Sequence, residues 1–329
     1  FFFKWKVIES MPETSLDKLK KLTTIVADTG DFAQLEKYQP QDSTTNPSLI
    51  LAASGMKDYA HLVDDAIEYG RKNGESQEER VEKALDKVAV NFGIEILKIV
   101  PGRVSTEIDA RLSYDTEATV KKAKEILALY KDAGIDKDRV LLKIASTWEG
   151  LQAAKLLEAE DIHVNMTLMF SLTQAMVAAE ANATLISPFV GRITDFYKQK
   201  KGVDGFPAAE DPGVLSVKQI YNYYKSHGYK TVVMGASFRN KEQVLELAGC
   251  DLLTVSPNLL GEIQQSENDV PQTLDASKSS SDVPKTVLTE SEFRWRMCQD
   301  ECAHFKLAEG IRKFAIDLEK LQKQFEDKI

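Results

Sequence analysis

The sequence predicts an α/β protein built as a single (β/α)8 (TIM) barrel, with additional N-terminal and long C-terminal helices. Short apolar segments alternate along the chain with amphipathic segments of helical length. About eight segments of each kind occur, which is the number such a barrel requires. Several short segments are apolar on both faces, as expected for parallel strands covered by helices. The strands are expected within 23–30, 42–50, 103–110, 140–150, 163–170, 183–191, 231–239 and 252–257.

The segments between the strands carry helix and loop signals. The helix expected over 116–133 is followed by Gly134, a typical C-cap residue. Residues 193–212 contain glycine and proline and predict an irregular loop, whereas 264–286, rich in Ser, Asp and Pro, predict a linker. One long helix is expected over 289–327. Its inward-facing stripe would be Phe305, Leu307, Ile311, Phe314, Leu318 and Leu321. Other helices are expected at 15–21, 31–38, 56–73, 81–99, 149–160, 171–181, 216–227 and 240–248.

Residues 1–10 differ from the rest of the chain. They hold three phenylalanines, two lysines and a tryptophan, and they precede Met11. The segment is too short for a signal peptide and shows no small-residue cleavage site. We expect it to be an extension outside the fold, with an amphipathic contact segment as the alternative. Residues 11–329 are then expected to form one barrel domain together with the C-terminal helix.

Composition excludes several classes of protein. The net charge of −9 and the isoelectric point near 5.2 disfavour nucleic-acid binding, which requires a basic face. An acidic protein still binds phosphorylated substrates when a few arginines are focused at one site. No apolar run reaches membrane-spanning length, so no membrane contact is expected. Three cysteines without framework spacing predict a reducing compartment, and therefore a cytoplasmic location.

A lysine lies in the middle of the fourth expected strand. Side chains alternate along a strand, so Lys143 shares a face with Leu141 and Ala145. Burial disfavours the charged form of an amine and frees it to attack a carbonyl. Lys143 is therefore a candidate Schiff-base residue. The alternative is a structural lysine whose ammonium group reaches solvent at the end of the strand.

The other strands favour the catalytic interpretation. In barrel enzymes the active site forms at the carboxyl ends of the strands. Seven strands place a polar or ionisable residue there, where a purely structural core would carry Val, Ile and Leu. Arg192 follows directly after the sixth strand. The candidates on the strands are Asp28, Thr44, Asn46, Glu107, Lys143, Asn165, Thr167, Ser187, Phe189, Ser237 and Arg239.

These residue types fit carbon–carbon bond chemistry on a phosphorylated ketone. A lysine amine condenses with a ketone to give an iminium, which withdraws electrons from the neighbouring bond. Loss of the hydroxyl needs an acid and bond cleavage needs a base, and Glu107 and Asp28 could divide these tasks. Arg192 and Arg239 are planar donors suited to phosphate, and Ser237 offers a further donor. No P-loop, nucleotide fingerprint or metal triad is found in the sequence.

Each of these residues also has a structural interpretation. Asp28 precedes a glycine and could form a turn. Asn46 precedes Pro47 and could cap a helix. Glu107 could face solvent if its strand were at an edge, and the two arginines could form ordinary surface salt bridges.

Two motifs in particular make the sequence resemble the transaldolases. They are Asp42-Ser-Thr-Thr-Asn-Pro-Ser-Leu-Ile50 and Leu142-Lys-Ile-Ala-Ser-Thr-Trp-Glu-Gly150. The resemblance extends from about Leu16 to Phe325, which is nearly the whole chain. All candidate positions carry the residue expected in that family. Supporting motifs lie at 100–111, 186–192 and 234–240.

The resemblance implies specific roles. Lys143 would form a Schiff base with a ketose phosphate, and Glu107 would act as acid and base through a water held by Thr167. Asp28 would take the proton from the hydroxyl next to the breaking bond. The dihydroxyacetone unit would be held by Asn46, Asn165 and Ser187, with Thr44 and Phe189 beside it, and the phosphate by Arg192, Ser237 and Arg239.

The reaction implied is a transfer of a dihydroxyacetone unit from sedoheptulose 7-phosphate to glyceraldehyde 3-phosphate. Its products are erythrose 4-phosphate and fructose 6-phosphate, and it belongs to the non-oxidative pentose phosphate pathway. The resemblance implies no cofactor and no metal, and a homodimer is expected.

Two alternatives remain at this stage. The first is an aldolase that releases free dihydroxyacetone, which Phe189 disfavours because aldolase-active relatives tend to carry tyrosine there. The second is a sugar-phosphate-binding barrel without catalysis, which should have lost Lys143, Glu107 or Asp28, whereas all three are present.

Overall fold

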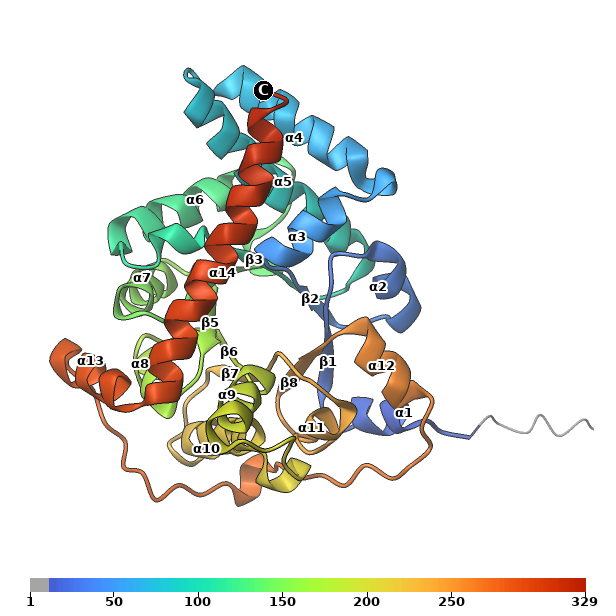
Figure 1. The fold of residues 1–329 in the computed structure, drawn as a ribbon, viewed down its shortest axis with the longest axis vertical. Helices are drawn as coiled ribbons and strands as arrows, with labels where there is room; N and C mark the ends of the chain where they lie inside the picture. The colour runs from blue at the N-terminus through green and yellow to red at the C-terminus, as the bar shows by residue number, and fades with distance from the viewer. Residues whose placement is uncertain (1–11) are drawn as a thin grey trace, which may run out of the picture.

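Eight parallel strands close into a barrel in the computed structural model, which describes residues 12–329 (Figure 1). The strands pair in chain order and β8 pairs with β1, so the predicted barrel fold is confirmed. The predicted extension, residues 1–10, lies outside the described residues. The strands are β1 (Thr24–Asp28), β2 (Asp42–Thr44), β3 (Val104–Glu107), β4 (Val140–Ala145), β5 (Val164–Met169), β6 (Leu185–Pro188), β7 (Val232–Gly235) and β8 (Leu252–Val255).

Helices surround the barrel and cover the outer face of the sheet (Figure 1). Many begin at the polar residue that follows a strand, because a side-chain oxygen there accepts a backbone N–H of the first turn. They are α1 (Ser15–Lys20), α2 (Phe32–Tyr38), α3 (Pro47–Ser54), α4 (Ala60–Asn73), α5 (Gln77–Ile99), α6 (Thr116–Asp132), α7 (Trp148–Ala159), α8 (Leu172–Glu180), α9 (Gly191–Lys201), α10 (Pro212–Ser226), α11 (Lys241–Leu245), α12 (Pro257–Gln264), α13 (Glu290–Gln299) and α14 (Glu301–Glu326). Short 3₁₀ turns lie at Lys57–Tyr59, Ala110–Leu112, Lys137–Arg139, Ala208–Glu210 and Ala276–Lys278.

Two apolar cores lie on the two sides of the sheet. On β4, Leu142 and Ile144 point outward into the core shared with the helices, as the alternation predicts. Leu141 points into the barrel instead, where it meets apolar residues of three other strands. This small inner cluster closes the barrel below the polar residues at the carboxyl ends of the strands. Its buried members are Val26, Leu141, Leu185 and Met234.

The predicted loop over 193–212 is wrong in its first half, where the structure has α9. Glycine and proline are concentrated from residue 202 onward, whereas residues 192–201 contain neither. Gly202 ends the helix with a φ of 65°, a left-handed conformation that favours glycine. The irregular chain therefore begins only at that residue.

Several other helices also differ from prediction: α4 begins at Ala60 rather than residue 56, α10 begins at Pro212 rather than 216, and α11 ends at Leu245 rather than 248. The strand expected within 42–50 ends at Thr44, and α3 begins at Pro47.

Helix α5 begins at Gln77 rather than at residue 81, because Ser76 Oγ accepts the backbone N–H of Glu79 at 3.1 Å and caps the helix. Helix α12 follows β8 directly and was not predicted. Its first residue is Pro257, whose fixed φ suits the first turn of a helix.

The single helix predicted over 289–327 is two helices, α13 and α14, separated at Asp300. The Asp300 side chain accepts the backbone N–H of Ala303 at 2.9 Å and starts the second helix. Phe305 is 59% exposed, which contradicts its place in the inward stripe. Leu318 is partly buried. The other stripe residues, Leu307, Ile311, Phe314 and Leu321, are buried as predicted.

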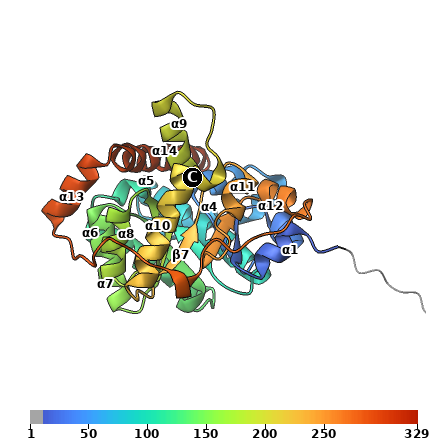
Figure 2. The same ribbon diagram turned by 90° about the horizontal axis from the view of Figure 1, so that it is seen from below.

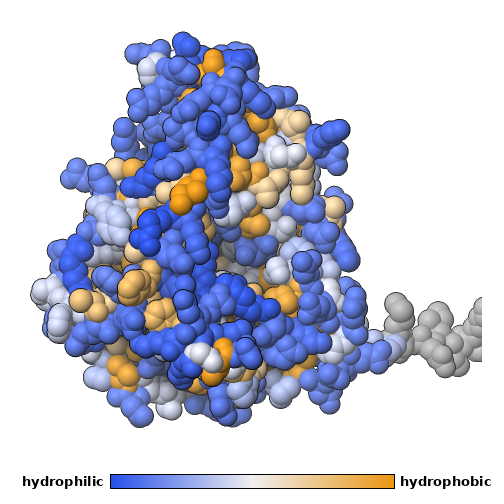
Figure 3. All heavy atoms as spheres, viewed as in Figure 1, coloured by the Kyte–Doolittle hydropathy of each residue, from blue (hydrophilic) through white to orange (hydrophobic). Residues whose placement is uncertain are grey.

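Helix α14 lies over one side of the barrel mouth, above β3 and β5 (Figures 1 and 2). Beyond the mouth, its last turns pack against α3, α4 and α5 in a third apolar cluster, which includes Leu321 and Phe325. The residues on the face that carries α14 are mostly hydrophilic (Figure 3). Within residues 12–329, no helix has the length and apolar character needed to cross a membrane.

Candidate active site

The strand register brings the predicted ionisable residues together. Lys143 of β4 lies in register with Glu107 of β3 on one side and with Asn165 of β5 on the other. Asp28 of β1 lies in register with Thr44 of β2. In a parallel sheet, residues in register point to the same side. The alignment predicted at the carboxyl ends of these strands is therefore confirmed.

The Lys143 ammonium group lies inside the barrel mouth. Its side chain is only 6% exposed, so the interpretation of a lysine reaching solvent is wrong. Lys143 Nζ donates a hydrogen bond to the backbone oxygen of Thr45 at 3.0 Å. It also lies 3.0 Å from Glu107 Oε2, an ion-pair distance without the alignment of a hydrogen bond. The amine is thus held beside a carboxylate and away from bulk water.

Glu107 of β3 and Asp28 of β1 both lie near Lys143 in surroundings that are shielded from solvent. Burial raises the pKa of Glu107, while the neighbouring Lys143 charge opposes this rise. Burial also raises the pKa of Asp28, against the charge of Lys143 and a hydrogen bond from Thr44 Oγ1 at 2.9 Å. Carboxyl groups with raised pKa values exchange protons closer to neutral pH, which suits an acid and a base.

A chain of polar side chains continues across the next strands. Ser187 Oγ donates to Asn165 Oδ1 at 2.6 Å, and Asn165 Nδ2 donates to Ser105 Oγ at 3.0 Å. These bonds fix the amide orientation of Asn165. Ser105 was not predicted as a site residue, although it lies two positions before Glu107 on the same face of β3.

The end of β5 is irregular at the site. Leu168 has a φ of 50°, and the pairing of β5 with β6 shifts between Met166 and Met169. The buried amide of Gln174 donates from Nε2 to the backbone oxygens of Leu168 and Ser146, both at 3.0 Å. Next to this irregularity, the buried Thr167 Oγ1 has no hydrogen-bond partner among residues 12–329. It is thus available to a ligand or a water.

Two arginines lie at the outer end of the site. The Arg192 guanidinium carbon lies 4.9 Å from the ring centre of Phe189 and 5.5 Å from that of Phe314. Burial and the charge of Arg239 lower the pKa of Arg192. Its buried Nη1 has no hydrogen-bond partner within the described part of the chain. Such a group favours an anionic ligand, since an orphaned buried donor costs about 1–3 kcal/mol.

Arg239 is held differently, at the rim of the cleft. Its Nε and Nη2 donate to Asp195 Oδ2 of α9 at 3.0 and 2.8 Å, so the predicted surface salt bridge exists for this arginine. Ser237, two residues earlier, has a φ of 60°, a strained conformation that turns the chain at the end of β7. Both residues line the same cleft as Arg192.

Most of these groups line one cleft of about 670 Å³ at the barrel mouth, and Glu107 lies beside the Lys143 amine. A buried amine, two carboxyl groups and two arginines around it match the constellation predicted from the sequence. The family model described as Transaldolase/Fructose-6-phosphate aldolase matches residues 25–325. The chain belongs to this family.

Curated relatives agree with this membership over nearly their whole length. The "Probable transaldolase" of Dictyostelium discoideum is 63% identical over 313 residues, which cover 94% of this chain and 98% of that protein. "Transaldolase B" of Pasteurella multocida (strain Pm70) is 56% identical over 316 residues, covering 96% of this chain and 100% of the relative. The "Transaldolase" of Mannheimia succiniciproducens is also 56% identical, over 96% and 99% of the two chains.

Most site residues predicted from the transaldolase motifs line this cleft directly. Asn46 lines it and also caps α3, since its Oδ1 accepts the backbone N–H of Leu49 at 3.0 Å, so its capping interpretation is confirmed. Three predicted residues are not in the lining: Glu107 and Asn165 contact the lining residues Lys143 and Ser187, and Thr167 lies in register with Ala145 of β4. The predicted residues in the lining are Asp28, Thr44, Asn46, Lys143, Ser187, Phe189, Arg192, Ser237 and Arg239. The lining residues that were not predicted are Ala236, Phe238, Thr254, Ser256 and Phe314.

The alternation of side chains could have found Thr254 and Ser256, which lie two residues apart at the end of β8. Phe314 could not be placed in this way. Its position depends on α14 lying over the barrel mouth, which strand periodicity does not report.

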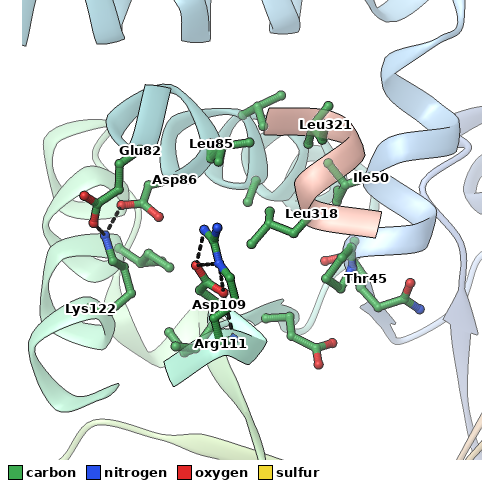
Figure 4. A pocket seen from close by; sticks show the side chains of 17 residues that line it. Thr45, Ile50, Glu82, Leu85, Asp86, Asp109, Arg111, Lys122, Leu318 and Leu321 are labelled. Carbon is green, nitrogen blue, oxygen red and sulfur yellow. Dashed lines mark hydrogen bonds and ion pairs between the residues drawn. The ribbon is translucent and has the colours of Figure 1, made fainter. Parts of the chain in front are cut away.

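A second cavity lies behind Glu107, between α5, α6 and α14 (Figure 4). Its walls are largely apolar, and Arg111 is paired there with Asp109 at 2.7 Å. At one end, Lys122 Nζ lies 2.7 Å from carboxylate oxygens of both Glu82 and Asp86. Together with Glu125, these two carboxylates are close enough to hold a cation, but the lysine ammonium group lies among them. The cluster is therefore an internal ion pair network.

Proposed function

We propose that this chain catalyses the transaldolase reaction through a Schiff base on Lys143. The activity is that of a transferase: a dihydroxyacetone unit moves from sedoheptulose 7-phosphate to glyceraldehyde 3-phosphate, giving erythrose 4-phosphate and fructose 6-phosphate. The observation that carries the proposal is the buried Lys143 amine, 3.0 Å from the Glu107 carboxylate. An amine in this position adds to a carbonyl with an acid–base group in reach.

The first stage of the reaction forms the iminium. Lys143 first gives its extra proton to the Glu107 carboxylate, and the free amine then attacks the ketose carbonyl carbon. The carbonyl oxygen takes up a proton from the attacking nitrogen and becomes a hydroxyl. This hydroxyl leaves as water after receiving a proton from Glu107, relayed by a water held at Thr167 Oγ1. The raised pKa of Glu107 supports this role, because its carboxyl group keeps a proton more readily than an exposed one.

The second stage breaks the carbon–carbon bond. Asp28 removes the proton from the hydroxyl on the far carbon of that bond. The bond electrons move into the iminium, an enamine forms on Lys143, and the aldose leaves. Reversal of these steps with a second aldose forms the new bond. The ion-pair distance of Lys143 to Glu107 and the raised pKa of the buried Asp28 carboxyl group support this division of work.

The remaining candidates bind substrate in this proposal. Asn165 and Ser187 hold the hydroxyls of the three-carbon unit through their shared hydrogen bond. Asn46 contributes its amide nitrogen, since its oxygen is used in the helix cap. Thr44 lies beside Asp28. The orphaned Nη1 of Arg192, together with Ser237 and Arg239, binds the phosphate group.

Transfer to an acceptor is favoured over release of free dihydroxyacetone. Release needs protonation of the enamine, which a tyrosine hydroxyl at position 189 would assist. Phe189 is 5% exposed, packs against Arg192 and carries no hydroxyl group.

Reduction with borohydride tests the Schiff base. With fructose 6-phosphate present, reduction is expected to add a dihydroxyacetone-derived mass to the peptide that contains Lys143. The Lys143→Met variant is expected to lose both the label and more than a thousandfold of the transfer rate, since covalent catalysis is removed. A label on another lysine, or an active Lys143→Met variant, would refute the proposal.

We further propose a cytoplasmic location and a homodimer. Three free cysteines support a reducing compartment. Light scattering at micromolar concentration tests the dimer, and a single-chain mass would exclude it.

A further inference from the structure

A chain of hydroxyl groups lies behind Asp28. Thr44 Oγ1 lies 2.9 Å from Asp28 Oδ1 and also 2.9 Å from Thr254 Oγ1. Thr254 comes from β8, which pairs with β1 on the side of the barrel away from β2. Both threonines are buried, with exposures of 2% for Thr44 and 4% for Thr254. Three strands thus contribute to one short chain that ends at the proposed base.

Counting protons fixes the direction of this chain. Ionised Asp28 has no proton and only accepts hydrogen bonds. The single hydroxyl proton of Thr44 is therefore donated to Asp28. The bond between the two threonines must then use the proton of Thr254, which is donated to Thr44 Oγ1. Within the described part of the chain, the Thr254 hydroxyl makes no other hydrogen bond.

We propose that Thr254 is a positioning residue that orients Asp28 through Thr44. By donating to Thr44, it holds the Thr44 oxygen in place and directs the Thr44 proton toward Asp28 Oδ1. The second carboxylate oxygen of Asp28 then stays directed to the substrate hydroxyl. The proposal rests on the proposed role of Asp28 as base, and it assigns Thr254 no contact with the reacting atoms.

The geometry separates this role from a packing role. Valine and threonine have nearly the same shape, so Thr254→Val removes the hydroxyl and keeps the volume. Thr254→Ser keeps the hydroxyl and removes the methyl group. If the hydrogen bond matters, Val impairs the enzyme and Ser restores it, whereas a packing role predicts the reverse order.

The test measures carbon–carbon cleavage and Schiff-base formation separately. Loss of one hydrogen bond is expected to lower kcat about 3- to 10-fold in Thr254→Val. KM for fructose 6-phosphate and the yield of borohydride trapping on Lys143 should stay within about twofold, because Thr254 does not touch these steps. Thr254→Ser should keep at least about half of the normal kcat. Thr106→Val is a matched control, since buried Thr106 on β3 bonds to Tyr130 of α6 instead.

A double-mutant cycle decides whether Thr254 acts through Thr44. In a Thr44→Val background, Thr254→Val should have no further effect on kcat. A persisting effect would show direct action on substrate and overturn the proposal, as would a normal kcat in Thr254→Val or an equal loss in Thr254→Ser. Asp28→Asn tests the assumption that Asp28 is the base. If this variant stays active, that assignment fails, whatever the Thr254 variants show.

Discussion

Arg192 places a guanidinium group between two aromatic rings at the edge of a polar cleft. Its stacking on Phe189 and Phe314 holds the group in place without neutralising its charge. Arg239, by contrast, is already paired with the Asp195 carboxylate. We infer that Arg192 contributes most of the attraction for a phosphate group, and that Arg239 helps to close the binding site around it.

Replacing Arg192 with methionine should therefore weaken phosphate binding while keeping the apolar contact with both rings. The expected result is a 10- to 100-fold higher KM for glyceraldehyde 3-phosphate, because a charge-assisted hydrogen bond contributes about 1.5–3 kcal/mol. The KM for unphosphorylated glyceraldehyde should change less than about threefold. Steady-state kinetics with both acceptors checks this, with Arg294→Met as a surface control. An equal rise for both acceptors would contradict the assignment.

At the level of single residues, the sequence predicted which side chains share the barrel mouth, but not the hydrogen bonds that connect them. The alternation of side chains placed Asp28, Glu107 and Lys143 on one face of their strands, and the structure agrees. It could not predict that Thr254 of β8 reaches Thr44 of β2, because a hydrogen bond between non-neighbouring strands depends on barrel stagger and curvature.

Helices α5 and α6 are joined by a charged side chain with little access to water. The Lys122 side chain is 8% exposed and reaches from α6 to Glu82 and Asp86 of α5. Burial raises the pKa of Asp86 to about 6, although Lys122 opposes this rise. Such a carboxyl group binds its proton more tightly in the folded state than in the unfolded state. Its contribution to stability is complete below pH 4 and is lost as the pH rises through about 6.

Replacing Lys122 with methionine should destabilise the fold in a pH-dependent way. At pH 7.5 the ionised Asp86 would lose its partner, with an expected loss of about 3 kcal/mol in the free energy of unfolding. The loss should shrink toward pH 5, because Asp86 then takes up a proton and becomes neutral. Urea unfolding at both pH values measures this. Lys121→Met, an exposed neighbour on α6, should change stability by less than about 0.5 kcal/mol. An equal loss of stability in Lys122→Met at both pH values would contradict the role assigned to Asp86.

Helix periodicity predicted most elements but misplaced some ends. The loop predicted over 193–212 was wrong in its first half, because the glycine and proline residues of the second half were taken to indicate a loop throughout. The break at Asp300 was missed because its capping bond to Ala303 N–H interrupts a sequence that otherwise continues in helical period. Local capping is decided by side-chain geometry, which composition does not report.

At the scale of the whole molecule, α14 connects the catalytic cleft to the apolar cluster around Leu321 and Phe325. Phe314 lines the cleft, whereas Phe325, about three turns further along the helix, is 1% exposed among residues of α3, α4 and α5. The C-terminal end of the helix thus fixes the part that lies over the barrel mouth.

Truncating Phe325 to alanine should loosen this anchor. We expect a loss of about 3 kcal/mol in the free energy of unfolding, since a large buried aromatic leaves a cavity. Thermal and urea denaturation measure it, with exposed Lys323→Ala as the matched control on the same turn. If the two variants are equally stable, the end of α14 does not anchor the helix.

The barrel itself was predictable as a whole because its repeated strand–helix order leaves few other arrangements. The path of the last helix was not, because an amphipathic stripe shows only that a helix packs somewhere.

This path has a consequence for biosynthesis. Strands β1 to β8 can be complete when residue 255 leaves the ribosome, yet the cleft still lacks Phe314 from α14. A growing polypeptide would thus carry a closed barrel whose cleft is still incomplete. The complete cleft would form only after α14 has been translated and has packed over the barrel mouth.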